Sequence, residues 1–180
     1  MSLLFTLALV LPTSSAQEKT KEEREQKVVL TLRKENGEYG TSAFSFRYET
    51  QDAARHKNAV DLVFNRCGLL HINAHGGMKN RIADLGKAEF AKVEKAPEKG
   101  WREECVRPVE GHVYYQVVEY GEDDDRDHLK FAVKFVVTKI KDDTVELKWA
   151  VVGKRPAMRD NSLDGENGAM GQCGGEHRER

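Results

Sequence analysis

The sequence predicts a mainly β protein, an antiparallel sandwich or a partly open barrel of about six to eight strands with one short helix. Two observations favour this fold class. Residues 129–152 alternate between apolar and polar side chains around a short polar break, and several shorter segments before them alternate in the same way. Successive side chains of a strand point to opposite faces, so a period of two indicates ribbons with one apolar face. The 180 residues suffice for one such domain with a core of its own.

Residues 129–152 form the clearest predicted hairpin, with its turn at Lys141-Asp142-Asp143. One face carries only apolar side chains: Leu129, Phe131, Val133, Phe135 and Val137, then Val145, Leu147, Trp149 and Val151. Lys130, Lys134 and Lys148 lie on the other face. A ribbon of two strands is not stable alone in water, so its apolar face must pack on a second layer. We therefore expect Trp149 in the core and these lysines in solvent.

Earlier segments predict the remaining strands. They cover residues 28–32, 44–48, 60–64, 70–74 and 113–117. Because Asn36-Gly37 is a turn signal, the first two of these strands are expected to form a hairpin with each other. Between residues 74 and 113 the apolar positions Ile82, Leu85, Phe90 and Val93 are spaced like one face of the short helix.

Four segments are predicted along the chain: a signal peptide at 1–16, a charged linker at 17–27, the β-rich domain at 28–152 and a disordered tail at 153–180. Residues 3–11 are apolar apart from Thr6, and small residues precede Gln17, which is typical of a secretory signal. Since no basic residue precedes this run, a buried strand or an uncleaved anchor is the alternative. No other segment could cross a membrane, so we expect a secreted or periplasmic protein.

If the protein is exported, its cysteines can form a disulfide. In an oxidising compartment a bridge between Cys67 and Cys105 would contribute about 4 kcal/mol at most, before strain is deducted. Two buried thiols fit a cytosolic protein equally well, so both alternatives stay open. Cys173, in the tail, would be an odd exposed thiol.

Overall charge argues against a nucleic-acid partner. The formal net charge is -1 and the isoelectric point is about 6.6, so the chain has no general electrostatic attraction for phosphate backbones. The aromatic residues are spaced like core residues. There is neither a Gly-rich phosphate loop nor a CxxC pair, and no cofactor is expected.

His71, Asn73, His75 and His112 are the candidate ligand-binding residues. On a straight strand His71 and His75 share a face but lie about 13 Å apart, too far for one metal ion. A bend at the following glycines, with His112 arriving from elsewhere, would allow a metal site or a hydrolase site. The alternative is that His71 and Asn73 line the polar face of a half-exposed strand.

Three pieces of the sequence resemble a known arrangement. They are residues 81–87 (RIADLGK), residues 109–114 (VEGHVY) and the hairpin that contains Trp149. Their order resembles that of uncharacterised small secreted bacterial β-domains, in which an I-x-D-L-G turn and a G-H-V-Y strand precede a C-terminal hairpin. This resemblance implies a small exported β-domain with no known activity and supplies no catalytic residues. Independently of it, Asp84 could cap the predicted helix and His112 could bond a neighbouring loop.

These observations favour an exported, non-catalytic binding or structural module. Its partner would be a cell-envelope component, a polysaccharide or another protein. The competing hypothesis is a small hydrolase or metal-binding protein that uses His71, His75 and His112. An enzyme requires these side chains to converge in one concave pocket, whereas a binding module requires an exposed aromatic or charged face instead.

Overall fold

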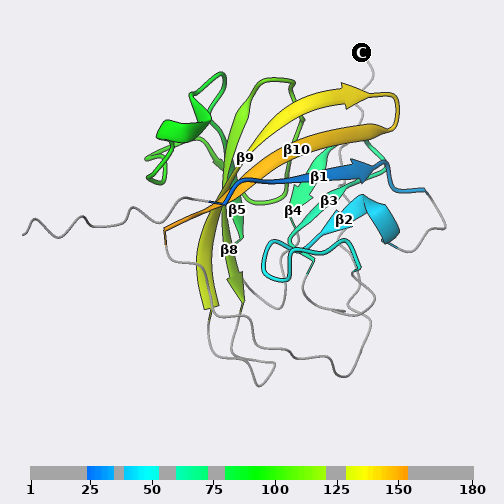
Figure 1. Cartoon of the computed structure of the whole chain (residues 1–180), viewed down its shortest axis with the longest axis horizontal. Helices are drawn as coiled ribbons and strands as arrows, with labels where there is room; N and C mark the ends of the chain where they lie inside the picture. The colour runs from blue at the N-terminus through cyan, green and yellow to red at the C-terminus, as the bar shows by residue number, and fades with distance from the viewer. Residues whose placement is uncertain (1–23, 35–38, 53–59, 73–79, 121–128, 154–180) are drawn as a thin grey trace, which may run out of the picture.

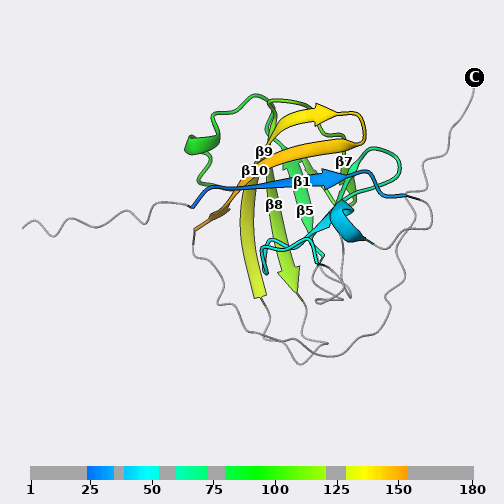
Figure 2. The ribbon, with the colours of Figure 1, turned by 45° about the vertical axis from the view of Figure 1, so that its right-hand side comes forward.

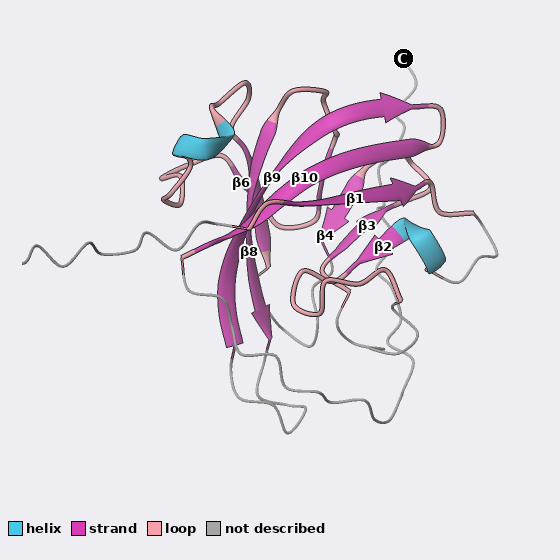
Figure 3. Ribbon diagram, viewed as in Figure 1, coloured by secondary structure: helices cyan, strands magenta, loops and turns pink. Residues whose placement is uncertain are grey.

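The computed structural model describes residues 24–34, 39–52, 60–72, 80–120 and 129–153, which form two antiparallel sheets (Figure 1). The predicted fold class is confirmed. Strands dominate the described residues, the helical segments among them are two short 3₁₀ turns, and neither sheet closes into a barrel (Figure 3). The predicted signal peptide and nearly all of the predicted tail lie outside the described residues.

The larger sheet has six strands. In spatial order they are β1 (Gln26–Thr31), β10 (Thr144–Val152), β9 (Leu129–Lys141), β8 (Val113–Tyr120), β5 (Arg81–Asp84) and β6 (Trp101–Arg102). The smaller sheet has the order β2 (Ala43–Phe44), β3 (Leu62–Phe64), β4 (Leu70–Ile72) and β7 (Cys105–Val106). The 3₁₀ turns are η1 (Gly40–Ser42) and η2 (Phe90–Lys92). β1 takes in the last two residues of the segment predicted as a linker.

The β9–β10 hairpin is confirmed and turns at Asp142, whose φ of 49° is left-handed. Aspartate tolerates this conformation better than most residues. The pairing shifts by one residue between Glu146 and Leu147, which leaves Thr138 as an extra residue in β9. The Thr138 hydroxyl donates to the Glu146 carbonyl at 3.1 Å, so the bulge is itself hydrogen-bonded.

The core lies between the two sheets and contains the apolar face predicted for the hairpin. Trp149 is 1% exposed, and its ring centroid lies 5.5 Å from that of Phe44 and 5.2 Å from that of Phe46. Phe46 also stacks on Phe135, and Phe135 stacks on Tyr114. These edge and stacked contacts join residues of both sheets into one aromatic cluster.

The predicted first hairpin is wrong. β1 pairs with β10, whereas β2 pairs with β3 in the other sheet. The predicted second strand also ends early, since residues 46–49 form a turn closed by hydrogen bonds between Ser45 and Thr50. Gln51 then donates from Nε2 to the carbonyls of Val29 and Thr41 at 2.7 and 3.0 Å, which ties β1 to η1.

The predicted helix at residues 82–93 is also wrong. Ile82 belongs to β5 and packs between the sheets, whereas Phe90 packs on the outer face of the larger sheet against Val113 and Ala150. This outer layer also covers Lys134, which was expected in solvent but is 1% exposed. Its ammonium donates to the Val93 carbonyl at 3.1 Å and lies over the Phe90 ring.

Candidate functional site

The structure places the predicted site residues on different sheets. His71 is half-buried in β4 of the smaller sheet, and His112 directly precedes β8 of the larger one. Asn73 and His75 lie outside the described residues. Within the described ranges, no group of three or more histidine, cysteine or acidic side chains is placed to hold a metal ion. His71 and His112 therefore have separate surroundings.

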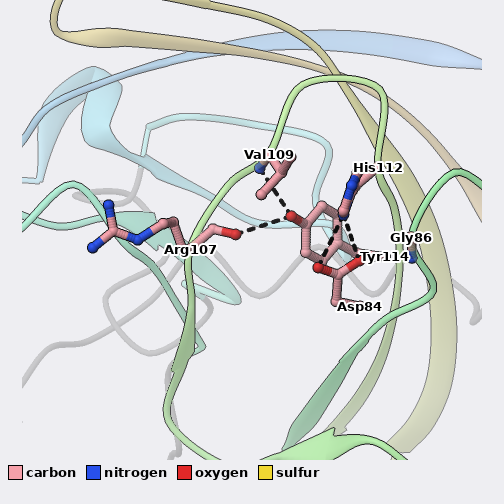
Figure 4. Close-up of polar contacts among 6 residues, drawn as sticks. All are labelled: Asp84, Gly86, Arg107, Val109, His112 and Tyr114. Atoms are coloured by element: carbon pink, nitrogen blue, oxygen red, sulfur yellow. Dashed lines mark hydrogen bonds and ion pairs between the residues drawn. The ribbon is translucent and has the colours of Figure 1, made fainter.

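His112 is held by Asp84 (Figure 4). Its Nδ1 lies 3.1 Å from both carboxylate oxygens of Asp84, and one of these oxygens also accepts the Gly86 N–H at 2.8 Å. The structure thus joins the two motifs of residues 81–87 and 109–114. As expected, the ring bonds a neighbouring segment, but Asp84 caps the turn after β5 rather than a helix. A carboxylate on Nδ1 orients the imidazole, an arrangement that also serves acid–base catalysis.

Next to this pair, Tyr114 makes hydrogen bonds that stabilise the fold. The Tyr114 hydroxyl donates to the Arg107 carbonyl at 2.9 Å and accepts the Val109 N–H at 3.0 Å (Figure 4). Burial, with Asp84 acting in the same direction and the Val109 N–H opposing, raises the pKa of Tyr114 to about 12. The hydroxyl therefore stays protonated at neutral pH. It ties the loop before β8 to the strand.

His71 has Cys105 as its cross-strand neighbour. The two residues are directly opposite in the β4–β7 pair, and the Ile72 N–H donates to the Glu104 carbonyl at 2.9 Å. His71 and Cys105 thus form a non-hydrogen-bonded pair, in which Cβ atoms lie about 4.5–5.5 Å apart on one face. Burial lowers the pKa of His71, although the charge of Glu104 acts in the opposite direction. A neutral imidazole beside a thiol can act as a base.

Cys67 and Cys105 are not joined by a disulfide. The pairing register gives the reason, because the residue opposite Cys105 is His71, four positions along the chain from Cys67. Cys67 lies in the turn between β3 and β4, where its N–H donates to the Asn65 side chain. Disulfides require Cα atoms within about 7 Å, and the register places His71 rather than Cys67 beside Cys105. Cys173 lies outside the described residues.

A buried polar cluster surrounds Asp61 and was not predicted. Asp61 has no exposed surface, and its carboxylate accepts hydrogen bonds from the Phe46 N–H, the Arg47 N–H, the Ser45 hydroxyl and the Tyr120 hydroxyl. Burial raises the pKa of Asp61 to about 6, against the opposing effect of these donors. The sequence signal for it was a carboxylate inside the apolar segment VDLVF at residues 60–64.

The end of β1, η1 and the β9–β10 turn lie close together (Figure 2), and an open cleft lies among them. Its volume is about 460 Å³, within the range of small-ligand sites. The lining residues are Thr31, Leu32, Arg33, Lys34, Tyr39, Gly40, Thr41, Ser42, Asp143 and Thr144. The cleft is thus rich in hydroxyl groups and holds two basic residues, one acidic residue and one aromatic ring.

Backbone and side-chain hydrogen bonds fix the cleft walls. The Leu32 N–H donates to the Asp143 carbonyl at 2.6 Å, and the Arg33 N–H donates to the Phe64 carbonyl at 3.0 Å. The Thr31 and Thr41 hydroxyls lie 2.7 Å apart. The Arg33 guanidinium carbon lies 4.6 Å from the centroid of the Tyr39 ring. The cleft therefore presents a cation–aromatic pair on a wall that both sheets support.

The charge of Arg33 also acts on the Tyr39 hydroxyl. Burial raises the pKa of Tyr39, while the Arg33 charge and its hydrogen bond act in the opposite direction. The hydroxyl is therefore a neutral donor and acceptor at physiological pH.

Comparison of the chain with protein-family models, with curated proteins and with solved structures finds no significant match. In the described part of the chain, no helix is both long enough and apolar enough to cross a bilayer.

Proposed function

We propose that this protein is an exported, non-catalytic binding module that holds an acidic segment of a cell-envelope polysaccharide in the cleft at the end of β1. The stacked Arg33–Tyr39 pair on the cleft wall carries the proposal. Sugars offer hydroxyl groups that both donate and accept hydrogen bonds, together with apolar C–H faces that pack on aromatic rings. A site for them combines hydroxyl side chains with an aromatic surface.

The charge of the cleft selects for an acidic sugar. Arg33 and Lys34 supply two positive charges and Asp143 one negative charge, so the lining carries a net charge of about +1. A guanidinium binds a carboxylate through two parallel N–H donors, whereas an ammonium acts as a point charge. Arg33 is therefore expected to bind the carboxylate of a uronic-acid unit directly, with Lys34 adding attraction.

Calorimetric titration of the full-length protein with oligogalacturonate tests the proposal, with an uncharged malto-oligosaccharide for comparison. We expect binding of the acidic oligomer alone. Arg33→Ala and Tyr39→Ala should each weaken it about tenfold, or 1.4 kcal/mol. Lys139→Ala removes the same charge from an exposed position on β9 outside the cleft and should leave the affinity unchanged. Equal binding of both sugars, or unchanged affinity in Arg33→Ala, would contradict the proposal.

The same oligomers separate binding from hydrolysis. A binding module returns them at their original length after long incubation, which chromatography of the recovered sugar measures. The competing hydrolase hypothesis has its best support in the Asp84–His112 pair. Shortened oligomers produced by the native chain, and no longer produced by His112→Gln, would favour the hydrolase.

A further inference from the structure

Arg47 is a buried cation at one end of the space between the sheets. It lies in the turn at residues 46–49, which the paired hydrogen bonds between Ser45 and Thr50 close. Its exposed fraction is 6%. Arginine is almost never buried to this extent unless a partner neutralises it, because removing its charge from water is costly.

The guanidinium of Arg47 keeps hydrogen-bonding capacity. Its carbon lies 5.2 Å from the Tyr48 ring centroid and 5.1 Å from the Tyr120 ring centroid, so aromatic rings supply part of its surroundings. Its Nε and Nη1 atoms are buried, and no group in the described ranges accepts a hydrogen bond from them. Two aromatic contacts leave these donors unsatisfied, and buried donors without acceptors destabilise a fold.

No hydrogen bond joins the Asp61 carboxylate to Nε or Nη1 of Arg47. Its carboxylate is already engaged by the Tyr120 hydroxyl, the Ser45 hydroxyl and two backbone N–H groups, one of which belongs to Arg47 itself. Gln116 is bound to the same residue through Nε2, which donates to the Asp61 carbonyl at 2.9 Å, while its own Oε1 is buried with no donor among the described residues. The cluster therefore has unused donors on Arg47 and an unused acceptor on Gln116.

We propose that Arg47 anchors an internal binding site for a carboxylate, separate from the cleft at the end of β1. A carboxylate presents two oxygens in one plane, which match the fixed planar donors of a guanidinium. It adds one negative charge next to Arg47 and the ionised Asp61. A phosphate dianion would leave an excess negative charge beside the ionised Asp61, so a monoanion fits better.

Urea unfolding of the full-length protein at pH 7.5 tests this proposal, with sodium acetate replacing sodium chloride at constant ionic strength. Acetate should stabilise the native chain in a saturable way. At about 100 times its dissociation constant it should lower the unfolding equilibrium constant about 100-fold. The stabilisation by acetate should disappear in Arg47→Met. The affinity for acetate should weaken at least tenfold in Arg47→Lys, which keeps the positive charge but loses the planar pair of N–H donors.

Arg81→Met is the matched control. The Arg81 guanidinium also lies over an aromatic ring, that of Trp101 at 4.2 Å, but Arg81 is exposed. This variant should keep the whole acetate effect. Equal stabilisation of the native chain by acetate and chloride would overturn the proposal, as would an undiminished acetate effect in Arg47→Met. Stronger stabilisation by phosphate than by acetate would overturn the choice of a carboxylate.

A direct measurement covers the case in which Arg47→Met does not fold. The Nε–H resonance of Arg47 in the native chain, assigned by its loss in Arg47→Lys, should shift during an acetate titration that leaves the Arg81 resonance in place. A resonance that does not move at saturating acetate would show that the anion does not reach Arg47.

Discussion

The Tyr120 hydroxyl donates its hydrogen bond to the Asp61 carboxylate, and the two side chains bring β8 together with the segment before β3 inside the protein. Asp61 is fully buried and Tyr120 is 2% exposed. Burial, followed by the charge of Asp61, raises the pKa of Tyr120 well above its ordinary range. Tyr120 therefore remains a donor at every pH at which the protein would work, and Asp61 is the member of the pair that titrates.

The first prediction concerns the pH dependence of stability. The pKa of Asp61 is about 6 in the folded chain against an ordinary value of 3.8, so the folded state binds this proton more tightly. The contribution of Asp61 to the free energy of unfolding is complete below pH 3.8. This contribution is lost as the pH rises through 6. The loss is about 3 kcal/mol for this group alone. Asp61→Asn should remove this fall in the free energy of unfolding, measured with urea from pH 4 to 7. Asp142→Asn, at an exposed turn, is the control, and identical pH profiles in native and Asp61→Asn chains would contradict the assignment.

The second prediction concerns the Asp84–His112 pair. The side chains are 37% and 24% exposed, so solvent screens their interaction. A double-mutant cycle with Asp84→Asn and His112→Gln should give a coupling energy of about 0.5–1 kcal/mol in urea unfolding at pH 6. Strictly additive effects of the two substitutions would show that the contact does not stabilise the fold.

The third prediction concerns the two tryptophans. Trp149 packs among Phe44 and Phe46 in the core, so Trp149→Ala should lower the free energy of unfolding by about 3–5 kcal/mol. Trp101 is half-buried on the outer face of the larger sheet, against Tyr115 and Arg81. Trp101→Ala should therefore cost less than half as much. Similar losses in denaturant unfolding of the two variants would contradict the assignment of the inward face.

The fourth prediction concerns the thiols. Both Cys67 and Cys105 should be alkylated by iodoacetamide without reductant, as peptide mass spectrometry can measure. Because His71 lies opposite Cys105 and can accept its proton, His71→Gln should slow alkylation of Cys105 several-fold. Cys67 in the same chain serves as the internal reference and should be unaffected. An unchanged ratio of the two rates would show that the imidazole does not assist the thiol.

Alternation predicted the fold class but not the pairing of strands. The β9–β10 hairpin was predicted because both of its strands and its turn are adjacent in the sequence. β1 has the same alternation, yet its partner is β10, more than a hundred residues away in the chain. Local patterns carry no information about such a distant partner, so the turn signal at Asn36-Gly37 led to the wrong hairpin.

The predicted helix failed for a different reason. Ile82 belongs to the core between the sheets, whereas Leu85, Phe90 and Val93 belong to a small apolar layer outside the larger sheet. Apolar residues that serve two separate layers happened to have helical spacing. Arg47 and Asp61 were missed because charged residues are normally exposed, and only tertiary structure shows that they are buried.

The side chain of Gln51 binds the backbone at one edge of the larger sheet. β1 is the outer strand of the larger sheet, and an outer strand offers its backbone groups to strands of other copies. By donating to the Val29 carbonyl, Gln51 occupies an acceptor that an incoming strand would need. One amide thus obstructs edge-to-edge aggregation along β1, and Gln51→Ala is expected to make the purified protein more prone to form fibrils.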